Sequence, residues 1–244
     1  MQSLKIKKYL ILSGTLIIIL SIVGILFYKE GVLNDHIVKK VEEFFLVKNI
    51  ETIGRKRASK PKLLSILKNY QNTTLLSLDL ESIQMEVEKV PWIKKVIIRR
   101  ILPNKLSLTI EEFIPKAVWV RGRDRFVLDK NGYLIEKIFD QEYKNYFTVK
   151  GVEADLNLMM LIENLENFPE IYNQIDYANF IGRRRWDLHY KTGVKILLPQ
   201  DKVNDSLSIL QSYIKNNRLI EKGHKKIDLR VDGKITTDRV MKND

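Results

Sequence analysis

Cysteine is absent from the 244-residue chain, and histidine occurs only three times. Without thiols the protein can form neither a disulfide framework nor a metal site with cysteine ligands. The histidines, His36, His189 and His224, are far apart in the sequence and lack the spacing of a metal-binding motif. The sequence therefore predicts no metal site and no cofactor.

Motifs of catalytic sites are missing as well. No glycine-rich phosphate-binding loop precedes a predicted helix, and the nucleophile motif G-x-S-x-G does not occur. Glu111 and Glu112 are neighbours in a predicted strand, so their carboxylates point to opposite faces and cannot act as a facing pair. The sequence contains no positive indication of an enzyme.

Acidic residues are fewer than basic ones, and the formal net charge is +12. The basic residues are spread along the whole chain, which favours a general role in solubility over a nucleic-acid site. The densest cluster, residues 183–185, precedes Trp186, and this combination could bind phosphate and stack on a base. However, Trp186 alternates with Leu188 and Tyr190, which predicts that it packs in the core. We therefore expect a protein partner at these arginines rather than nucleic acid.

Charge is also absent from residues 9–28 near the N-terminus. A helix of that length spans about 30 Å at about 1.5 Å per residue, which matches the hydrocarbon core of a bilayer. Tyr9 and Tyr28 stand at its two ends, where aromatic side chains line membrane interfaces. No small-residue cleavage site follows Phe27, so the pattern predicts an uncleaved transmembrane helix rather than a signal peptide. Lysines flank both ends of this run, so charge alone does not set its orientation.

The next part of the chain predicts a small α+β domain over residues 46–113. A short strand is followed by two helices, for which Ser59 and Asp79 are suitable N-caps. A strand hairpin follows, with turn residues at Leu102-Pro103-Asn104-Lys105. Two helices can cover one face of a three-stranded sheet in this order of elements.

Residues 114–240 are richer in strands. Asp129-Lys130-Asn131-Gly132 is a strong hairpin signal between two apolar runs. Helices are predicted over residues 155–166 and 203–216, and a last hairpin is predicted over residues 226–240. The fold class is therefore α+β, with a second β-rich domain that carries two helices.

Residues 88–119 resemble a known family in the order and spacing of their landmarks. The matching residues are Pro91-Trp92-Ile93, Arg99-Arg100, Leu102-Pro103-Asn104, Leu106, Glu111-Glu112, Pro115 and Ala117-Val118-Trp119. They are similar to the end of the POTRA domain of the bacterial division proteins FtsQ and DivIB. Residues 184–188 and 227–230 resemble landmarks of the family's second domain, so the resemblance covers nearly the whole chain. We expect structural roles for Pro91, Trp92, Pro103 and Trp119.

The resemblance implies a non-enzymatic, single-pass protein of the bacterial inner membrane at the division site. Such proteins are scaffolds of the divisome that recruit and link later division proteins and help control septal peptidoglycan synthesis. The expected organisation is a cytoplasmic tail (1–8), a transmembrane helix (9–28), a juxtamembrane connector (29–45), a periplasmic POTRA domain (46–113), a β domain (114–240) and a tail (241–244). The alternative is a POTRA-bearing component of protein export or outer-membrane assembly.

The resemblance also implies how partners bind. The last strand of the second domain would accept a strand from a small bitopic FtsB-like protein, which acts together with an FtsL-like one, while the POTRA domain would contact other divisome proteins. No later strand in the chain covers that last strand, and an uncovered edge invites pairing. Nearby arginines would attract an acidic segment of the partner. The expected partner-binding residues are Arg183, Arg184, Arg185, Arg230, Ile235, Thr236, Thr237, Asp238, Arg239 and Val240.

Overall fold

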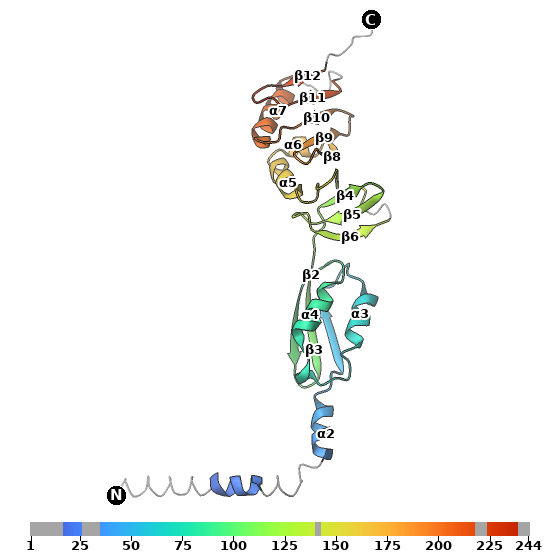
Figure 1. The fold of residues 1–244 in the computed structure, drawn as a ribbon, viewed down its shortest axis with the longest axis vertical. Helices are drawn as coiled ribbons and strands as arrows, with labels where there is room; N and C mark the ends of the chain where they lie inside the picture. Colours follow the sequence, from blue (N-terminus) through green and yellow to red (C-terminus); the bar gives the residue numbers. More distant parts are fainter. Residues whose placement is uncertain (1–16, 26–34, 140–142, 218–223, 239–244) are drawn as a thin grey trace, which may run out of the picture. The chain divides into compact units, whose positions relative to one another are not determined.

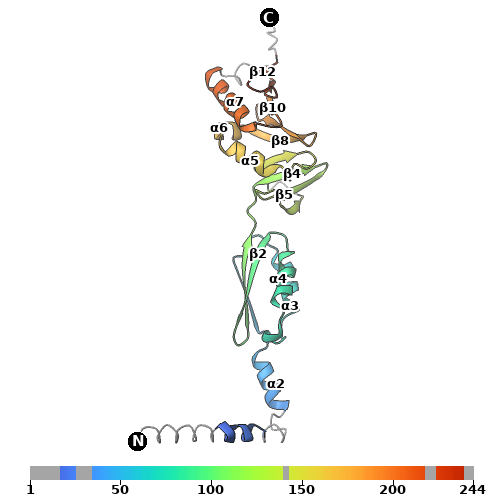
Figure 2. The same ribbon diagram turned by 60° about the vertical axis from the view of Figure 1, so that its left-hand side comes forward.

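The computed structural model describes residues 17–25, 35–139, 143–217 and 224–238 (Figures 1 and 2). The chain forms two compact units. Unit 1 comprises Met1–Val90 with Lys95–Glu111, and unit 2 comprises Pro91–Lys94 with Glu112–Asp244.

Unit 1 has the predicted order of strand, helix, helix, strand and strand. Its three strands lie in the order β1-β3-β2, with β1 parallel to β3. Helices α3 and α4 cover one face of this sheet (Figure 2). The elements are α2 (Asp35–Phe44), β1 (Asn49–Ile53), α3 (Lys60–Lys68), the 3-10 helix η1 (Leu75–Ser77), α4 (Leu80–Glu88), β2 (Ile93–Ile101) and β3 (Lys105–Glu112).

The two helices on the sheet begin at the predicted caps. The Ser59 side chain accepts a hydrogen bond from the Lys62 amide, and the Asp79 carboxylate accepts from the amides of Glu81 and Ser82. These contacts satisfy amide groups that have no partner within the helix. The apolar face of each helix is buried, because apolar residues recur at helical spacing; the buried residues are Leu63, Leu67, Ile83 and Val87.

Unit 2 contains one sheet, which has nine strands within the described residues. Their order is β12-β11-β10-β9-β8-β7-β4-β5-β6. The strands are β4 (Ala117–Arg121), β5 (Asp124–Leu128), β6 (Leu134–Ile138), β7 (Phe147–Lys150), β8 (Ile175–Ile181), β9 (Arg185–Tyr190), β10 (Lys195–Leu197), β11 (Lys226–Asp228) and β12 (Thr236–Thr237). Strands β5 and β6 form the predicted hairpin.

Three helices accompany this sheet in the described residues, although the sequence predicts two. Helices α5 (Leu158–Glu166) and α6 (Pro169–Tyr172) connect the parallel strands β7 and β8, and α7 (Val203–Asn217) lies between the parallel strands β10 and β11 in the chain. The additional helix is the single turn α6. Its first residue is Pro169, and proline is favoured at the first position of a helix.

The predicted transmembrane helix lies largely outside the described residues. Residues 17–25 are helical, while residues 9–16 and 26–28 and the two predicted tails are outside the description. Within the part of the chain that is described, no helix is both long enough and apolar enough to cross a membrane. The predicted connector contains helix α2.

Trp92 is buried, but it belongs to unit 2 and not to the POTRA core where the sequence places it. Its indole N–H donates to Glu136 Oε2 at 2.7 Å, and its ring stacks on Tyr143. Its carbonyl oxygen accepts from the Phe113 amide at 2.8 Å. Trp92 has a left-handed backbone, with φ of 78°, directly after Pro91. The sequence pattern indicates burial of this side chain, but not which group of residues buries it.

We predict that Trp92→Ala lowers the stability of unit 2 by about 3–5 kcal/mol, because a large buried aromatic side chain is lost. Trp92→Phe should have a smaller effect, since it keeps an aromatic ring against Tyr143 and removes the donor to Glu136 and only part of the buried ring surface. The other two tryptophans, Trp119 and Trp186, are both buried in unit 2. Their fluorescence during urea unfolding therefore measures this unit, and an unchanged midpoint for Trp92→Ala would contradict the prediction.

Candidate functional site: the sheet edge at β12

One edge of the unit 2 sheet is formed by β12, the last strand of the predicted final hairpin. Strand β12 pairs antiparallel with β11, with Ile227 opposite Thr237 and Asp228 opposite Thr236. It is the terminal strand in the sheet order, and among the described residues no strand pairs with its outer side (Figure 1). The structure therefore places Thr236 and Thr237 at an open edge.

The register of this pair determines which backbone groups face outward. The Asp238 amide donates to the Lys226 carbonyl oxygen. Hydrogen-bonded and non-hydrogen-bonded pairs alternate along an antiparallel ladder, so the amides at 236 and 238 face β11. The N–H and C=O of Thr237 then point away from the sheet. The side chain of the neighbouring Ile235 packs against the core of unit 2.

Asp238 makes its main contacts within the chain. Its carboxylate accepts hydrogen bonds from the amides of Lys225 and Lys226 at 3.0–3.1 Å. The bond from the Lys226 amide is the leading cause that lowers the pKa of Asp238. The last two expected partner-binding residues, Arg239 and Val240, lie outside the described residues.

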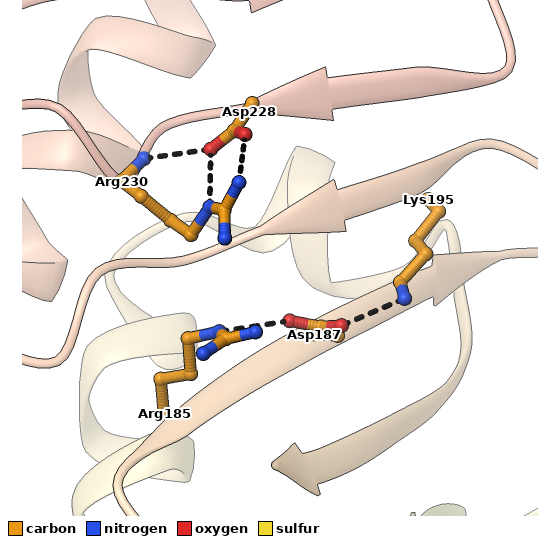
Figure 3. A network of polar contacts seen from close by, with 5 residues as sticks. All are labelled: Arg185, Asp187, Lys195, Asp228 and Arg230. Carbon is orange, nitrogen blue, oxygen red and sulfur yellow. Dashed lines mark hydrogen bonds and ion pairs between the residues drawn. The ribbon is translucent and has the colours of Figure 1, made fainter. Parts of the chain in front are cut away.

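Arg230 is also engaged within the chain (Figure 3). Its Nε and Nη2 donate to the two carboxylate oxygens of Asp228, at 2.9 and 2.6 Å, and its backbone amide donates to the same carboxylate. This two-pronged ion pair lowers the pKa of Asp228 and raises that of Arg230. Much of the positive charge expected from Arg230 is therefore compensated locally.

A second ion-pair group surrounds Asp187 on β9. The Asp187 side chain is only 3% exposed and lies 2.8 Å from Lys195 Nζ and 3.6 Å from Arg185 Nε. Figure 3 shows this group on β9 and β10, and β10 in turn pairs with β11, the strand that carries Asp228. In the sequence, Asp187 and Asp228 stand out only as members of the family landmarks at residues 184–188 and 227–230, and their ion pairs are not predicted. The available signal is opposite charge two residues apart, which places both side chains on the same face of a strand.

The other two arginines of the predicted cluster lie in the turn between β8 and β9. Arg183 Nε is 3.3 Å from a carboxylate oxygen of Glu153, in an exposed pair. Arg184 is exposed, and within the described part of the chain it makes no ion pair. Trp186 is in the core, as predicted. The structure therefore places Arg185 on β9 and Arg230 just after β11, with β10 between these two strands. Arg184 is the uncompensated charge among the described arginines of the expected site.

Among the described side chains, His189 and His224 show no arrangement for chemistry. Within the described ranges, no group of three or more His, Asp or Glu side chains could hold a metal ion. His189 stacks on Tyr177 with 4.2 Å between ring centroids, and burial, assisted by Lys195, lowers its pKa. Trp119 is buried, and its indole N–H donates to the Gly151 carbonyl oxygen.

We predict that Asp187→Asn destabilises unit 2 by about 1–3 kcal/mol, because the carboxylate is buried and binds two cations. Lys195→Met should cost less than about 1 kcal/mol, since Lys195 is 40% exposed and its charge is screened by water. In the Lys195→Met background, Asp187→Asn should still cause most of its loss of stability, because the Asp187 carboxylate keeps its ion pair with Arg185. Urea unfolding of the parent, the two single variants and the double variant measures these free energies. If Asp187→Asn and Lys195→Met had equally small effects on stability, the buried Asp187 carboxylate would not be the main contributor to this ion-pair group.

Comparison with protein families gives two matches that together cover most of the chain. The model described as "POTRA domain, FtsQ-type" matches residues 45–113. The model described as "Cell division protein FtsQ/DivIB, C-terminal" matches residues 117–230. The two matches follow one another in the order that the sequence landmarks predict.

Comparison with individual proteins gives relatives of the same description. The cell division protein FtsQ of Rickettsia typhi is 30% identical over 186 residues, which cover 76% of this chain and 70% of that protein. FtsQ of Zymomonas mobilis is 30% identical over 197 residues, covering 80% of this chain and 62% of that protein. Among solved structures, the major extracytoplasmic domain of DivIB from Geobacillus stearothermophilus aligns with a TM-score of 0.33 and 15% identity, over 44% of this chain and 97% of that one. On the strength of the family models and the FtsQ relatives, the chain belongs to the FtsQ/DivIB family of bacterial cell division proteins.

Proposed function

We propose that this protein is a non-enzymatic, single-pass scaffold of the divisome, which recruits and links later division proteins and helps control septal peptidoglycan synthesis. Membership of the FtsQ/DivIB family supports a role in division. The observation that carries the proposed binding mode is the open edge of β12, with the amide and carbonyl of Thr237 facing outward.

The proposed partner is a small bitopic FtsB-like protein, acting with an FtsL-like one, that adds a strand to β12. Strand addition derives its affinity from main-chain hydrogen bonds, and side chains at alternate positions set its register. In this arrangement Thr237 supplies one donor and one acceptor to the incoming strand. The POTRA domain would contact other divisome proteins.

An acidic segment next to the added strand would fit the charges around this edge. Lys226 on β11 and Arg184 in the β8–β9 turn are both exposed, whereas Arg230 is paired with Asp228. Long-range attraction between exposed charges accelerates association and weakens as salt is added. Lys226, together with Arg184 from the arginines predicted from the sequence, is therefore the proposed source of this steering.

We predict that Thr237→Pro weakens binding of the FtsB-like periplasmic fragment by at least about tenfold, because proline removes the outward amide donor. Thr237→Val is the matched control, since it keeps the amide and the approximate shape of the side chain. Ile235→Pro is a poorer test because the Ile235 side chain packs on the core. Binding of the full-length protein in detergent should be measured at low and high salt, where the loss caused by proline persists. Equal affinity for the two Thr237 variants would place the partner elsewhere.

The proposed location is the inner membrane at the division site, with the N-terminus in the cytoplasm and the bulk of the chain in the periplasm. A fluorescent fusion should form bands at mid-cell, and deletion of residues 236–244 should leave the fusion in the membrane while reducing recruitment of the FtsB-like partner. Uniform fluorescence around the envelope would instead favour a component of protein export or outer-membrane assembly.

A further inference from the structure

Strand β12 is unusually short for the role proposed above, with only two residues in its pairing with β11. Two ladder pairs fix a register weakly, because few hydrogen bonds distinguish one alignment from the next. A one-residue slip would turn the Thr237 amide toward β11 and present a different amide at the edge. Another contact is needed to hold this alignment, and the end of the hairpin provides one.

Asp238 supplies that contact directly after β12. In a regular antiparallel ladder, residues 226 and 238 would exchange both of their N–H···O bonds. Here the Asp238 amide donates to the Lys226 carbonyl oxygen, but the Lys226 amide donates to the Asp238 carboxylate. The Asp238 carbonyl oxygen lies 3.0 Å from His224 Nδ1 instead. The side chain has therefore replaced the backbone as the second acceptor of the ladder.

The same carboxylate also holds the preceding amide. Lys225 N lies 3.1 Å from Oδ1 and 3.0 Å from Oδ2 of Asp238. Hydrogen bonds to a charged acceptor are stronger than those between neutral groups, and two successive amides fix the position of the carboxylate along β11. A slipped strand would carry Asp238 past these amides and lose both contacts.

We propose that Asp238 is a positioning residue that locks the register of β12 on β11 and so keeps the Thr237 amide facing outward. The register lock stands on the contacts within this chain, whereas the use of the outward amide by a partner strand rests on the proposed function. Asp238 then acts through Thr237 and does not itself bind the partner strand.

The test measures amide hydrogen exchange at single-residue level in the full-length protein in detergent. It compares the parent protein with Asp238→Ala. The amides of Thr236, Lys225 and Lys226 should exchange at least about tenfold faster in Asp238→Ala, because the stronger acceptors are gone and the alignment is released. Asp232→Ala is the matched control. Asp232 lies in the same final hairpin, but its carboxylate binds the Lys202 side chain and not the amides of β11. Its removal should leave these exchange rates unchanged.

Asp238→Glu tests whether a carboxylate is the required group. This variant should recover part of the protection of the Lys225 and Lys226 amides from exchange. If Asp238→Ala acted only through a local packing defect, restoring a carboxylate would not recover this protection. Unchanged exchange in Asp238→Ala, or equal acceleration in Asp232→Ala, would overturn the register lock.

Addition of the FtsB-like fragment separates this inference from the proposed function. In the parent protein the fragment should slow exchange of the Thr237 amide, and in Asp238→Ala that slowing should be lost. Full slowing at Thr237 in Asp238→Ala would refute the positioning role. If the parent shows no slowing at Thr237, strand addition at β12 is wrong, while the exchange rates without the fragment still decide whether Asp238 locks the register.

Discussion

The hydrogen-bonded ladder across unit 2 is the constraint on which the rest of this unit depends. Strands β10, β11 and β12 have three, three and two residues, too few to be stable as a separate sheet. Strand β12 pairs with β11, β11 with β10, and β10 with β9, which belongs to the longer pair β8 and β9. The position of each short strand therefore depends on the pairing of its inner neighbour. Burial of apolar residues between the sheet and its helices supplies the main stabilising free energy, while the ladder determines where each edge residue lies.

Local features of the fold could be predicted from the sequence because they depend on neighbouring residues. Ser59 and Asp79 cap the helices that they were expected to cap. The hairpins β5–β6 and β11–β12 were predicted from their turn residues and from the alternation of apolar and polar residues. The order of the nine strands could not be predicted in this way, since three of the pairings are parallel and join distant segments. Trp92 illustrates the same limit: its burial is evident from its type, but its partners Glu136 and Tyr143 lie more than 40 residues away.

The location of the candidate site at the last strand could be predicted from the sequence, but its side-chain contacts could not. An uncovered last strand follows from the hairpin pattern, and the structure has β12 at the edge. The arginines were expected to present free charge, yet Arg230 and Arg185 each bind an aspartate two residues away on the same face of the sheet. A count of basic residues cannot show such pairing, because it depends on side-chain direction. The inward carboxylate of Asp238 was missed for the same reason.

The small size of β12 has a consequence for the protein's behaviour at high local concentration. A long, flat, apolar edge would pair with copies of itself and begin an aggregate, whereas natural sheets limit this with short and charged edge strands. Two threonines flanked by Asp238 and by the exposed Lys234 and Lys226 form such an edge. A strand that paired with this edge, as proposed, would therefore contribute most of the length and apolar surface of the pairing itself. Many copies crowded into one narrow zone of a cell could then remain unaggregated while each edge stays open to a different chain.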